Sequence, residues 1–306
     1  MPARAVIELR DVDISRGTEP VLRRLSADIV VGRVAAFVSE DTDAVSVLAD
    51  VLCGRTNGYR VEGDLVLDGR ELVSRTGGQE KTQAEQFVVE VRAVAESRET
   101  TGETLRAALG AGRKDDVTDT LHALLMRVGL ETNTFDRRVN ALSEADRIRL
   151  GYAVAIAQRP QVVVVRVNYD AEASTQYLVH SALIHALAQE TPAAWVLAAN
   201  SLAIAADLAD DVHLLLAGRV VEQGSVYDVC LRPAMPYTKD LLLVTPRPHR
   251  ALPEYPAFVQ LAAHAGCPWV LNCREQTIPK CSQETPLLKL VGPGHEAACH
   301  LVVQHG

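Results

Sequence analysis

The sequence predicts an α/β fold with a mostly parallel sheet and an inserted helical segment. Two short runs, Val34 to Val38 and Val162 to Val165, are apolar at every position, which indicates strands buried on both faces. Segments with helical periodicity alternate with such strands, and this alternation is typical of a parallel sheet covered by helices. A chain of 306 residues that is 48% hydrophobic is long enough for one large domain with a buried core and a smaller second domain.

The first ninety residues are expected to hold most of the strands. Apolar residues at positions 44, 47, 48, 51 and 52 lie on one face of a helix that follows the strand 34–38. An Asp-Gly pair at 68–69 predicts a tight turn after a strand. The other expected strands are 5–12, 21–31, 64–68 and 87–91, with a turn at Gly17 and a polar loop over 75–86.

The stretch from Leu142 to Ala173 combines a helix, a buried strand and a polar end. Ser143 is expected to begin the helix, because a serine hydroxyl accepts a hydrogen bond from a first-turn amide. Pro160 ends the helical run, and the strand 162–165 follows. Asn168, Tyr169 and Asp170 come next, where the end of a strand meets a ligand in an open α/β sheet.

The rest of the chain continues the alternation and then changes character. Residues 100–160 are expected to be mainly helical, and no internal repeat is found. Four prolines, at 233, 236, 246 and 248, mark the start of a C-terminal extension. The remaining expected elements are a helix over 175–189 and strands over 195–199, 212–216 and 219–222.

Charge and hydropathy exclude several classes of protein. A net charge of −8 does not indicate a nucleic-acid partner. No run approaches the roughly eighteen apolar residues that a membrane-spanning helix needs. The N-terminal sequence MPARAVIELR lacks the apolar core of a signal peptide. We therefore expect a cytoplasmic protein that associates with a membrane only through partners.

Four of the six cysteines lie in the last forty residues, at Cys267, Cys273, Cys281 and Cys299. In a reducing compartment this crowding favours a metal or a cluster over disulfides. Four thiolates in a short irregular segment fit a cubane iron–sulfur cluster or a structural zinc ion, and four unliganded thiols are the remaining interpretation. Cys53 and Cys230 are expected to be core residues.

The segment that begins LSEAD and ends VVVVRV (142–167) resembles the signature helix and Walker B strand of ABC transporter ATPases. That family reads LSGGQ at the first motif, so Leu142 and Ser143 are kept and EAD replaces GGQ. Arg166 and Val167 stand where the family has the magnesium-binding Asp and the Glu that polarises water. The resemblance implies the fold of an ATPase without its catalytic groups.

Two further segments are similar to the ATP-binding subunits of oligopeptide and dipeptide importers, in the peptide/nickel import subfamily. That family reads AGRIVEQG and HPYTRALL where this chain has AGRVVEQG and MPYTKDLL (217–242), and its cysteine-rich tail matches VGPGHEAACHL (291–301). The resemblance implies an ABC-type nucleotide-binding domain over 1–235. Its RecA-like parallel core would carry an antiparallel β subdomain and a helical subdomain near 92–160. It also implies a four-cysteine extension over 236–306 that holds a [4Fe-4S] cluster, with zinc as the alternative.

The phosphate-binding loop of the resemblance falls on SEDTDAVS (39–46). Such a loop works because glycines let main-chain amides converge on phosphate while a lysine supplies a positive charge. Here Val45 replaces the lysine, and no lysine occurs before Lys81. We expect Asp43 or Thr42 to cap the following helix. Ser46 keeps the hydroxyl that ligates magnesium in the family, or is an ordinary helix serine.

The other nucleotide contacts of the family are also replaced. Arg16 lies at the tyrosine that stacks on adenine, Val89 near the glutamine that joins the metal to the coupling interface, and Asn200 at the switch histidine. Metal placement and charge stabilisation supply most of the rate enhancement in phosphoryl transfer. We therefore expect no ATP hydrolysis and no tight nucleotide binding at this chain's own site.

The resemblance implies a subunit that works in a pair. ABC domains associate head to tail, so Ser143 could reach the γ-phosphate of a nucleotide held with magnesium by an active ATPase partner, or could serve only as a helix cap. We expect a noncatalytic subunit of a peptide importer on the inner face of the cell membrane. Its other partners would be two transmembrane permeases and, through the complex, an extracytoplasmic peptide-binding protein. The alternative is a free-standing pseudo-ATPase that acts as an iron–sulfur scaffold or redox regulator.

Overall fold

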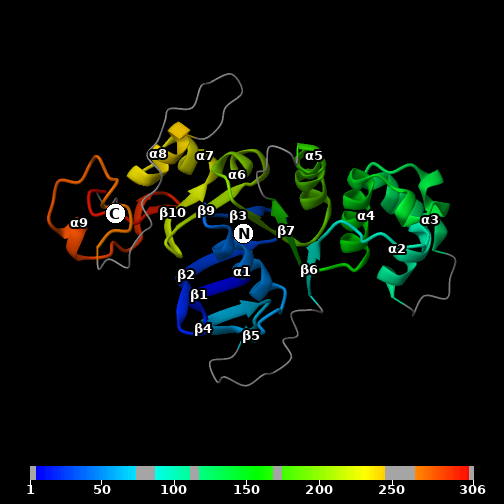
Figure 1. Ribbon diagram of the computed structural model, residues 1–306, viewed down its shortest axis with the longest axis horizontal. Coiled ribbons are helices and arrows are strands. Elements are labelled where there is room, and N and C mark those ends of the chain that lie inside the picture. The colour runs from blue at the N-terminus through cyan, green and yellow to red at the C-terminus, as the bar shows by residue number, and fades with distance from the viewer. Residues whose placement is uncertain (1–4, 74–86, 111–116, 168–173, 245–265, 303–306) are drawn as a thin grey trace.

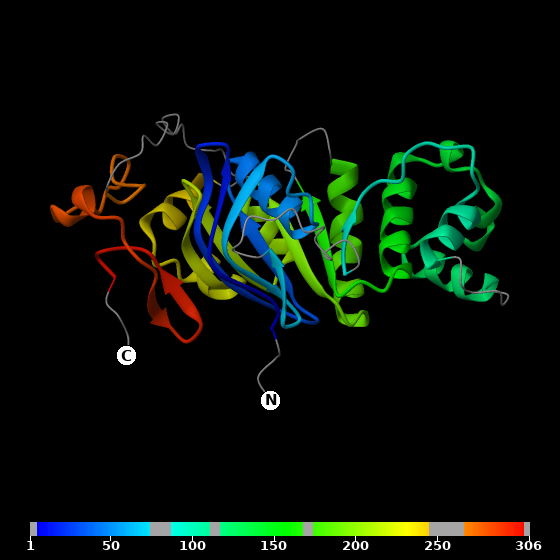
Figure 2. The same ribbon diagram turned by 90° about the horizontal axis from the view of Figure 1, so that it is seen from below.

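The computed structural model describes residues 5–73, 87–110, 117–167, 174–244 and 266–302. Two sheets and their helices form the middle of an elongated molecule (Figure 1). Helices α2 (Thr101–Leu109), α3 (Thr118–Arg127) and α4 (Glu144–Ala157) form a lobe at one end. The C-terminal extension lies at the opposite end, as the second view also shows (Figure 2).

The larger sheet confirms the predicted parallel arrangement. Its strand order is β11-β12-β10-β9-β3-β8-β7-β6, and the five strands from β9 to β6 are parallel. The strands are β3 (Val34–Val38), β6 (Val88–Val91), β7 (Val162–Val167), β8 (Ala194–Ala199), β9 (Asp211–Leu216), β10 (Arg219–Ser225), β11 (Lys289–Gly292) and β12 (His295–Ala297). The last two strands come from the extension, and β12 pairs antiparallel with both β10 and β11. This edge was not predicted.

The smaller sheet is antiparallel, with strand order β2-β1-β4-β5. Its strands are β1 (Ala5–Arg16), β2 (Glu19–Val30), β4 (Tyr59–Leu67) and β5 (Arg70–Val73). The predicted Asp-Gly turn joins β4 to β5, with φ of 47° at Asp68 and 79° at Gly69, the left-handed values that a two-residue hairpin needs. Three of these strands extend past their predicted ends because cross-strand pairing continues through polar positions.

Two apolar clusters fill the space around the parallel strands. Ala35 and Phe37 of β3 face a cluster that includes α1 (Thr42–Leu52) and the antiparallel sheet, while Ala36 and Val38 face the other. This alternation follows from the two-residue period of a strand. The second cluster contains α5 (Ser174–Glu190), α6 (Leu202–Leu208) and α7 (Val226–Leu231), together with α8 (Pro236–Val244).

The helical lobe begins with a capping box, in which Thr100 and Glu103 exchange hydrogen bonds of 3.2 and 2.7 Å. Three short helical turns complete the fold: η2 (Thr132–Asp136), η3 (Val139–Ala141) and α9 (Lys280–Gln283). The part of the chain that the structure describes holds no helix with the length and apolarity to cross a membrane. The predicted loop at 75–86, the polar residues 168–170 and the prolines at 246 and 248 lie outside the described residues.

Candidate functional site

The loop between β3 and α1 occupies the place of the phosphate-binding loop. The Asp41 carboxylate accepts a hydrogen bond from the Asp43 amide at 3.0 Å, and the Ser39 hydroxyl accepts one from the Asp41 amide at 3.1 Å. Asp41 is therefore the N-cap of α1, and the prediction of Asp43 or Thr42 was wrong. The reason is that Thr42 already belongs to the helix, whereas a cap residue keeps an extended backbone. Side chains of the loop thus bind amides that would otherwise bind phosphate.

Two further positions of the resemblance carry side chains that contact other parts of this chain. Val45, at the lysine position, is 1% exposed and packs in the core between the two sheets. Arg16, at the adenine position, pairs with Asp43 at 2.8 Å and lies 5.6 Å from the centre of the Tyr59 ring. This exposed pair joins the end of β1 to the first turn of α1.

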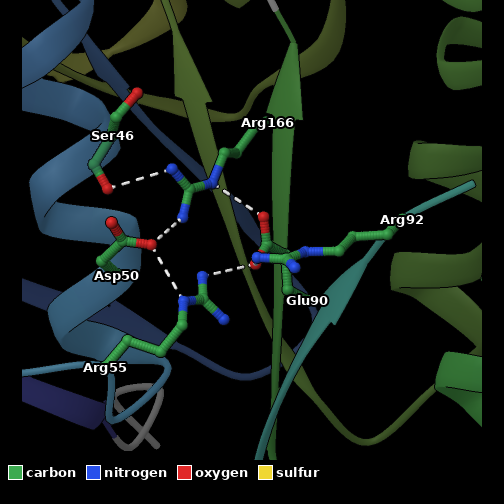
Figure 3. Close-up of polar contacts among 6 residues, drawn as sticks. All are labelled: Ser46, Asp50, Arg55, Glu90, Arg92 and Arg166. Carbon is green, nitrogen blue, oxygen red and sulfur yellow. Dashed lines mark hydrogen bonds and ion pairs between the residues drawn. The ribbon is translucent and has the colours of Figure 1, made fainter.

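Arg166, at the Walker B aspartate position, is the centre of an ionic cluster (Figure 3). Its guanidinium donates to Glu90 on β6 at 2.7 Å, to Asp50 on α1 at 2.5 Å and to the main-chain carbonyl of Ser46 at 3.1 Å. Arg55 bridges the same two carboxylates at 2.9 and 2.5 Å, and Arg92 binds Glu90 at 2.6 Å. We call Asp50, Arg55, Glu90, Arg92 and Arg166 the Arg166 cluster.

Both carboxylates of the Arg166 cluster are held ionised. Burial opposes the ionisation of Glu90, whose side chain is 7% exposed, but the hydrogen bond from Arg92 and the charges of Arg166 and Arg55 lower its pKa. Burial acts against Asp50 in the same way, and hydrogen bonds from Arg166 and Arg55 lower its pKa. Three positive and two negative charges leave this site positive, where an ATPase of the family binds a cation.

Three more positions at which the resemblance places nucleotide or metal contacts carry Val167, Val89 and Asn200. Val167, at the position of the water-polarising glutamate, is 3% exposed and packs in the core. Val89, near the glutamine position, is a half-buried residue of β6 that packs on the same core cluster. Asn200 lies between β8 and α6.

Ser143 begins α4, as the sequence predicted. Its hydroxyl accepts from the Asp146 amide at 3.1 Å, and its side chain is exposed. The Glu144 carboxylate accepts from the Gln176 amide group on α5 at 2.7 Å, so it is held by a neighbouring helix. Ser46 lies on α1, and the structure places α1 and α4 in separate parts of the molecule (Figure 1). The two serines therefore do not form one site within a single chain.

The four C-terminal cysteines gather in one region of the extension. Burial raises the pKa of Cys267 to about 11, and the other three thiols act in the same direction. Cys267, Cys273 and Cys299 each accept a hydrogen bond from the main-chain amide two residues later. Within the described ranges, however, no three His, Cys, Asp or Glu side chains form a group that could hold a metal ion. Cys53 is buried in the apolar cluster that includes α1, as predicted, and the half-buried Cys230 packs against the other cluster.

Sequence reasoning missed the residue that fastens the extension to the core. Glu222 on β10 is 0% exposed and accepts hydrogen bonds from His295 on β12 at 2.7 Å and from the amides of Ala234 and Met235 at 2.7 and 3.1 Å. A charged residue in VVEQG, directly after an apolar pair, was the available signal. A buried carboxylate needs such partners, so this pairing fixes both β12 and the start of α8.

Solved structures with the same arrangement are ABC transporter subunits. The chain matches cbiO1 of Clostridium perfringens, part of the transporter complex cbiONQ, with a TM-score of 0.63, 16% identity and coverage of 74% of this chain and 91% of that one. A second ATP-binding subunit of an ABC transporter matches with a TM-score of 0.57, 17% identity and coverage of 74% of this chain and 92% of that one. At these identities the likeness shows the fold, which is that of an ABC nucleotide-binding domain.

Sequence relatives narrow the class. A di/tripeptide transport ATP-binding protein of Pseudomonas aeruginosa is 26% identical, with coverage of 95% of this chain and 94% of that protein. A peptide import ATP-binding protein of Brucella ovis is 27% identical, with coverage of 92% of this chain and 92% of that protein. The dipeptide transport ATP-binding protein DppF of Escherichia coli is 30% identical, with coverage of 60% of this chain and 56% of that protein. No protein-family model matches the chain. The chain is thus similar over nearly its whole length to ABC transporter ATP-binding subunits of peptide and dipeptide import systems.

Proposed function

We propose that this chain is the noncatalytic ATP-binding-cassette subunit of a peptide importer. It pairs with an active homologous ATPase subunit that holds ATP and magnesium, and it lies on the cytoplasmic face of the membrane against two permeases. Peptide import is the role named for the relatives. An extracytoplasmic peptide-binding protein delivers the substrate to the assembled complex.

The Arg166 guanidinium carries the noncatalytic part of this proposal. A magnesium ion at a Walker B position needs oxygen ligands that are free to bind it. In this chain Asp50 and Glu90 already bind arginines, and the charge of Arg166 opposes a second cation. The amides bound by Asp41 and Ser39, and the buried Val45, support the same conclusion for the phosphates.

Titration of the purified chain with Mg-ATP tests this conclusion. We expect no heat of binding at micromolar concentrations and no ATPase activity from the isolated chain. Micromolar binding would overturn it. Purification from native membranes in mild detergent tests the assembly: an ATPase with an intact phosphate loop and two permeases should come with the chain. Recovery of the chain alone in the soluble fraction favours the alternative, a free-standing scaffold or redox regulator.

Ser143 serves the partner's nucleotide in this proposal, and one substitution separates that role from capping. Aspartate is as good an N-cap as serine, but it places a negative charge where the γ-phosphate of a partner's nucleotide would lie. Ser143→Asp should therefore keep the stability of the chain and strongly lower the ATPase rate of the complex. Ser46→Ala is the matched control, with an unchanged rate. If Ser143→Asp leaves the rate unchanged, Ser143 only caps α4.

We also infer that the four cysteines hold a [4Fe-4S] cluster, with zinc as the alternative. Three amide-to-sulfur hydrogen bonds act to lower the pKa of these thiols and so support thiolate ligands, against the opposing effect of burial. The described side chains do not present a formed ligand set. The group would supply folding energy to the extension. Iron and zinc analysis of anaerobically purified protein distinguishes the two. Cys273→Ser should lower the metal content and the stability of the protein. Cys230 is another half-buried cysteine, and Cys230→Ser should keep the metal. Wild-type protein that contains no iron or zinc would overturn the inference.

A further inference from the structure

A cavity of about 360 Å³ lies between the antiparallel sheet, β10 and the C-terminal extension. Its lining includes three arginines, Arg23, Arg24 and Arg219, and three apolar residues of the extension, Pro268, Leu287 and Leu288. Strands β2 and β10 lie on the side of the two sheets that is nearer to the extension (Figure 1). We call this space the Arg219 cavity. Neither the β3–α1 loop nor the start of α4 contributes to it.

The main chain forces two of these arginines together. The Arg23 amide donates to the Gly218 carbonyl at 2.8 Å, which seats the turn between β9 and β10 against β2. Gly218 has a φ of +72°, and a Cβ there would lie 2.2 Å from the carbonyl oxygen of Val21. Only glycine permits this contact. Arg219, the next residue, therefore has a fixed position beside Arg23.

The carboxylates near the cavity are already engaged. Asp11 pairs with the Arg24 guanidinium at 3.3 Å, and Asp13 accepts from the Arg24 amide at 3.1 Å. Glu296, from β12, accepts from the side-chain amide of Gln223 at 2.5 Å. Within the ranges that the structure describes, the guanidinium groups of Arg23 and Arg219 have no ion-pair or hydrogen-bond partner of this kind.

Electrostatics and backbone strain support a ligand at this place. Burial lowers the pKa of Arg219, and the positive charges of Arg23 and Arg24 lower it further, against a smaller opposing effect of Asp13. Asp11 and Arg24 both have left-handed backbones, with φ of 47° and 51°. Such strain in residues other than glycine gathers at functional sites. A like-charged cluster on a strained rim is stabilised when an anion binds.

We propose that the Arg219 cavity binds a small organic anion, with its carboxylate or phosphate head between Arg23 and Arg219 and its apolar body against the extension. Arginine forks match the oxygens of both head groups. Val220 and Val221 of β10 add to the apolar wall, and the hydroxyl of Ser26 is a further donor. Because the ligand would contact β2, β10 and the extension together, its binding stabilises the attachment of the extension.

Calorimetric titration of the full chain at low ionic strength tests this proposal with three probes: phenyl phosphate, benzoate and inorganic phosphate. We expect saturable binding of one aromatic anion, at least about tenfold tighter than inorganic phosphate because its ring buries apolar surface. The tighter of the two aromatic probes identifies the head group. The midpoint temperature of thermal unfolding should rise with ligand concentration as the measured affinity requires.

Two variants and one control locate the binding. Arg219→Gln and Arg23→Gln should each weaken the binding of the aromatic anion at least about tenfold, since each removes a charge-assisted hydrogen-bond donor. Arg60→Gln is the control, because Arg60 is an exposed arginine of β4 that pairs with Glu62, and it should bind like the wild type. The proposal is overturned if no probe binds saturably, or if both cavity variants bind as tightly as the control.

Discussion

The Arg166 cluster and the Arg219 cavity each contain three arginines, and they differ in how those arginines are neutralised. In the cluster, Asp50 and Glu90 bind all three arginines at 2.5 to 2.9 Å. In the cavity, Asp11 binds only Arg24. The same side chain therefore serves as structure in one place and as an open binding group in the other. The difference lies in the number of carboxylates that the fold brings within reach.

Arg166→Asp is expected to have the largest effect, although it restores the residue type of an active ATPase. It places a third carboxylate beside Asp50 and Glu90 and removes the donor to Ser46. Breaking a largely buried ion pair destabilises a protein by about 3–5 kcal/mol. Urea unfolding at neutral pH measures this loss. Arg60→Asp, on the surface, should lose less than about 1 kcal/mol. Equal stability of the two variants would show that the Arg166 cluster is not structural.

The sequence predicted individual strands, helices and turns, and a mostly parallel sheet, because local patterns carry that information, but it did not predict the strand order. The apolar runs of β3 and β7 and the apolar face of α1 marked the parallel core, and the Asp68-Gly69 pair marked a hairpin. Ser143 was identified as a helix start from its residue type alone. These features depend on neighbours a few residues apart, so a single sequence displays them.

The Arg166 cluster and the Arg219 cavity could not be predicted in this way. Arg166 contacts residues 76 and 116 positions away, and His295 contacts Glu222 across 73 positions. The resemblance aligns Arg166 with the Walker B aspartate, but the sequence does not indicate that Asp50 and Glu90 lie within reach of its guanidinium. The Arg219 cavity requires the contact of Gly218 with β2. Such contacts follow from the packing of elements that are distant in the chain.

Gly218→Ala should disturb the cavity and leave the Arg166 cluster intact. Alanine at a positive φ costs about 1–2 kcal/mol, and here a further loss comes from the clash with the Val21 carbonyl. Gly69→Ala is the matched control: it has a φ of +79° with nothing within 4 Å of a new Cβ. The midpoint temperature of thermal unfolding should be lower for Gly218→Ala than for this control. Binding of the aromatic anion should weaken only in Gly218→Ala; weakening in both variants contradicts the proposed geometry.

The pH dependence of stability should report on the Arg166 cluster. Arginines lower the pKa of Glu90 in the folded chain, so its contribution is present above the unfolded pKa and is lost as pH falls toward the folded one. Glu90→Gln should destabilise the chain at pH 7 by about 1.5–3 kcal/mol, the net contribution of a hydrogen bond to a charged group. This deficit should shrink below about pH 4.5, near the ordinary pKa of a glutamate. Urea unfolding at acid pH measures this difference in unfolding free energy between Glu90→Gln and the wild type. If the difference stays constant as the pH falls, the charge of Glu90 does not contribute to stability.

Arg219→Gln should have the smallest effect and the opposite sign. Removing one of three adjacent positive charges relieves repulsion, so without a ligand the variant should be more stable than the wild type by a few tenths of a kcal/mol, about the size of a surface charge interaction. The gain should disappear in roughly 1 M salt, where the screening length falls to about 3 Å. Arg166→Gln should lower stability at both salt concentrations, because it leaves buried carboxylates with fewer partners. A residue of a binding site is expected to behave in this way: its substitution stabilises the free chain and weakens anion binding, whereas substitution in a structural ion pair lowers stability. If Arg219→Gln lowers the stability of the free chain, the arginines of the Arg219 cavity, like those of the Arg166 cluster, are structural.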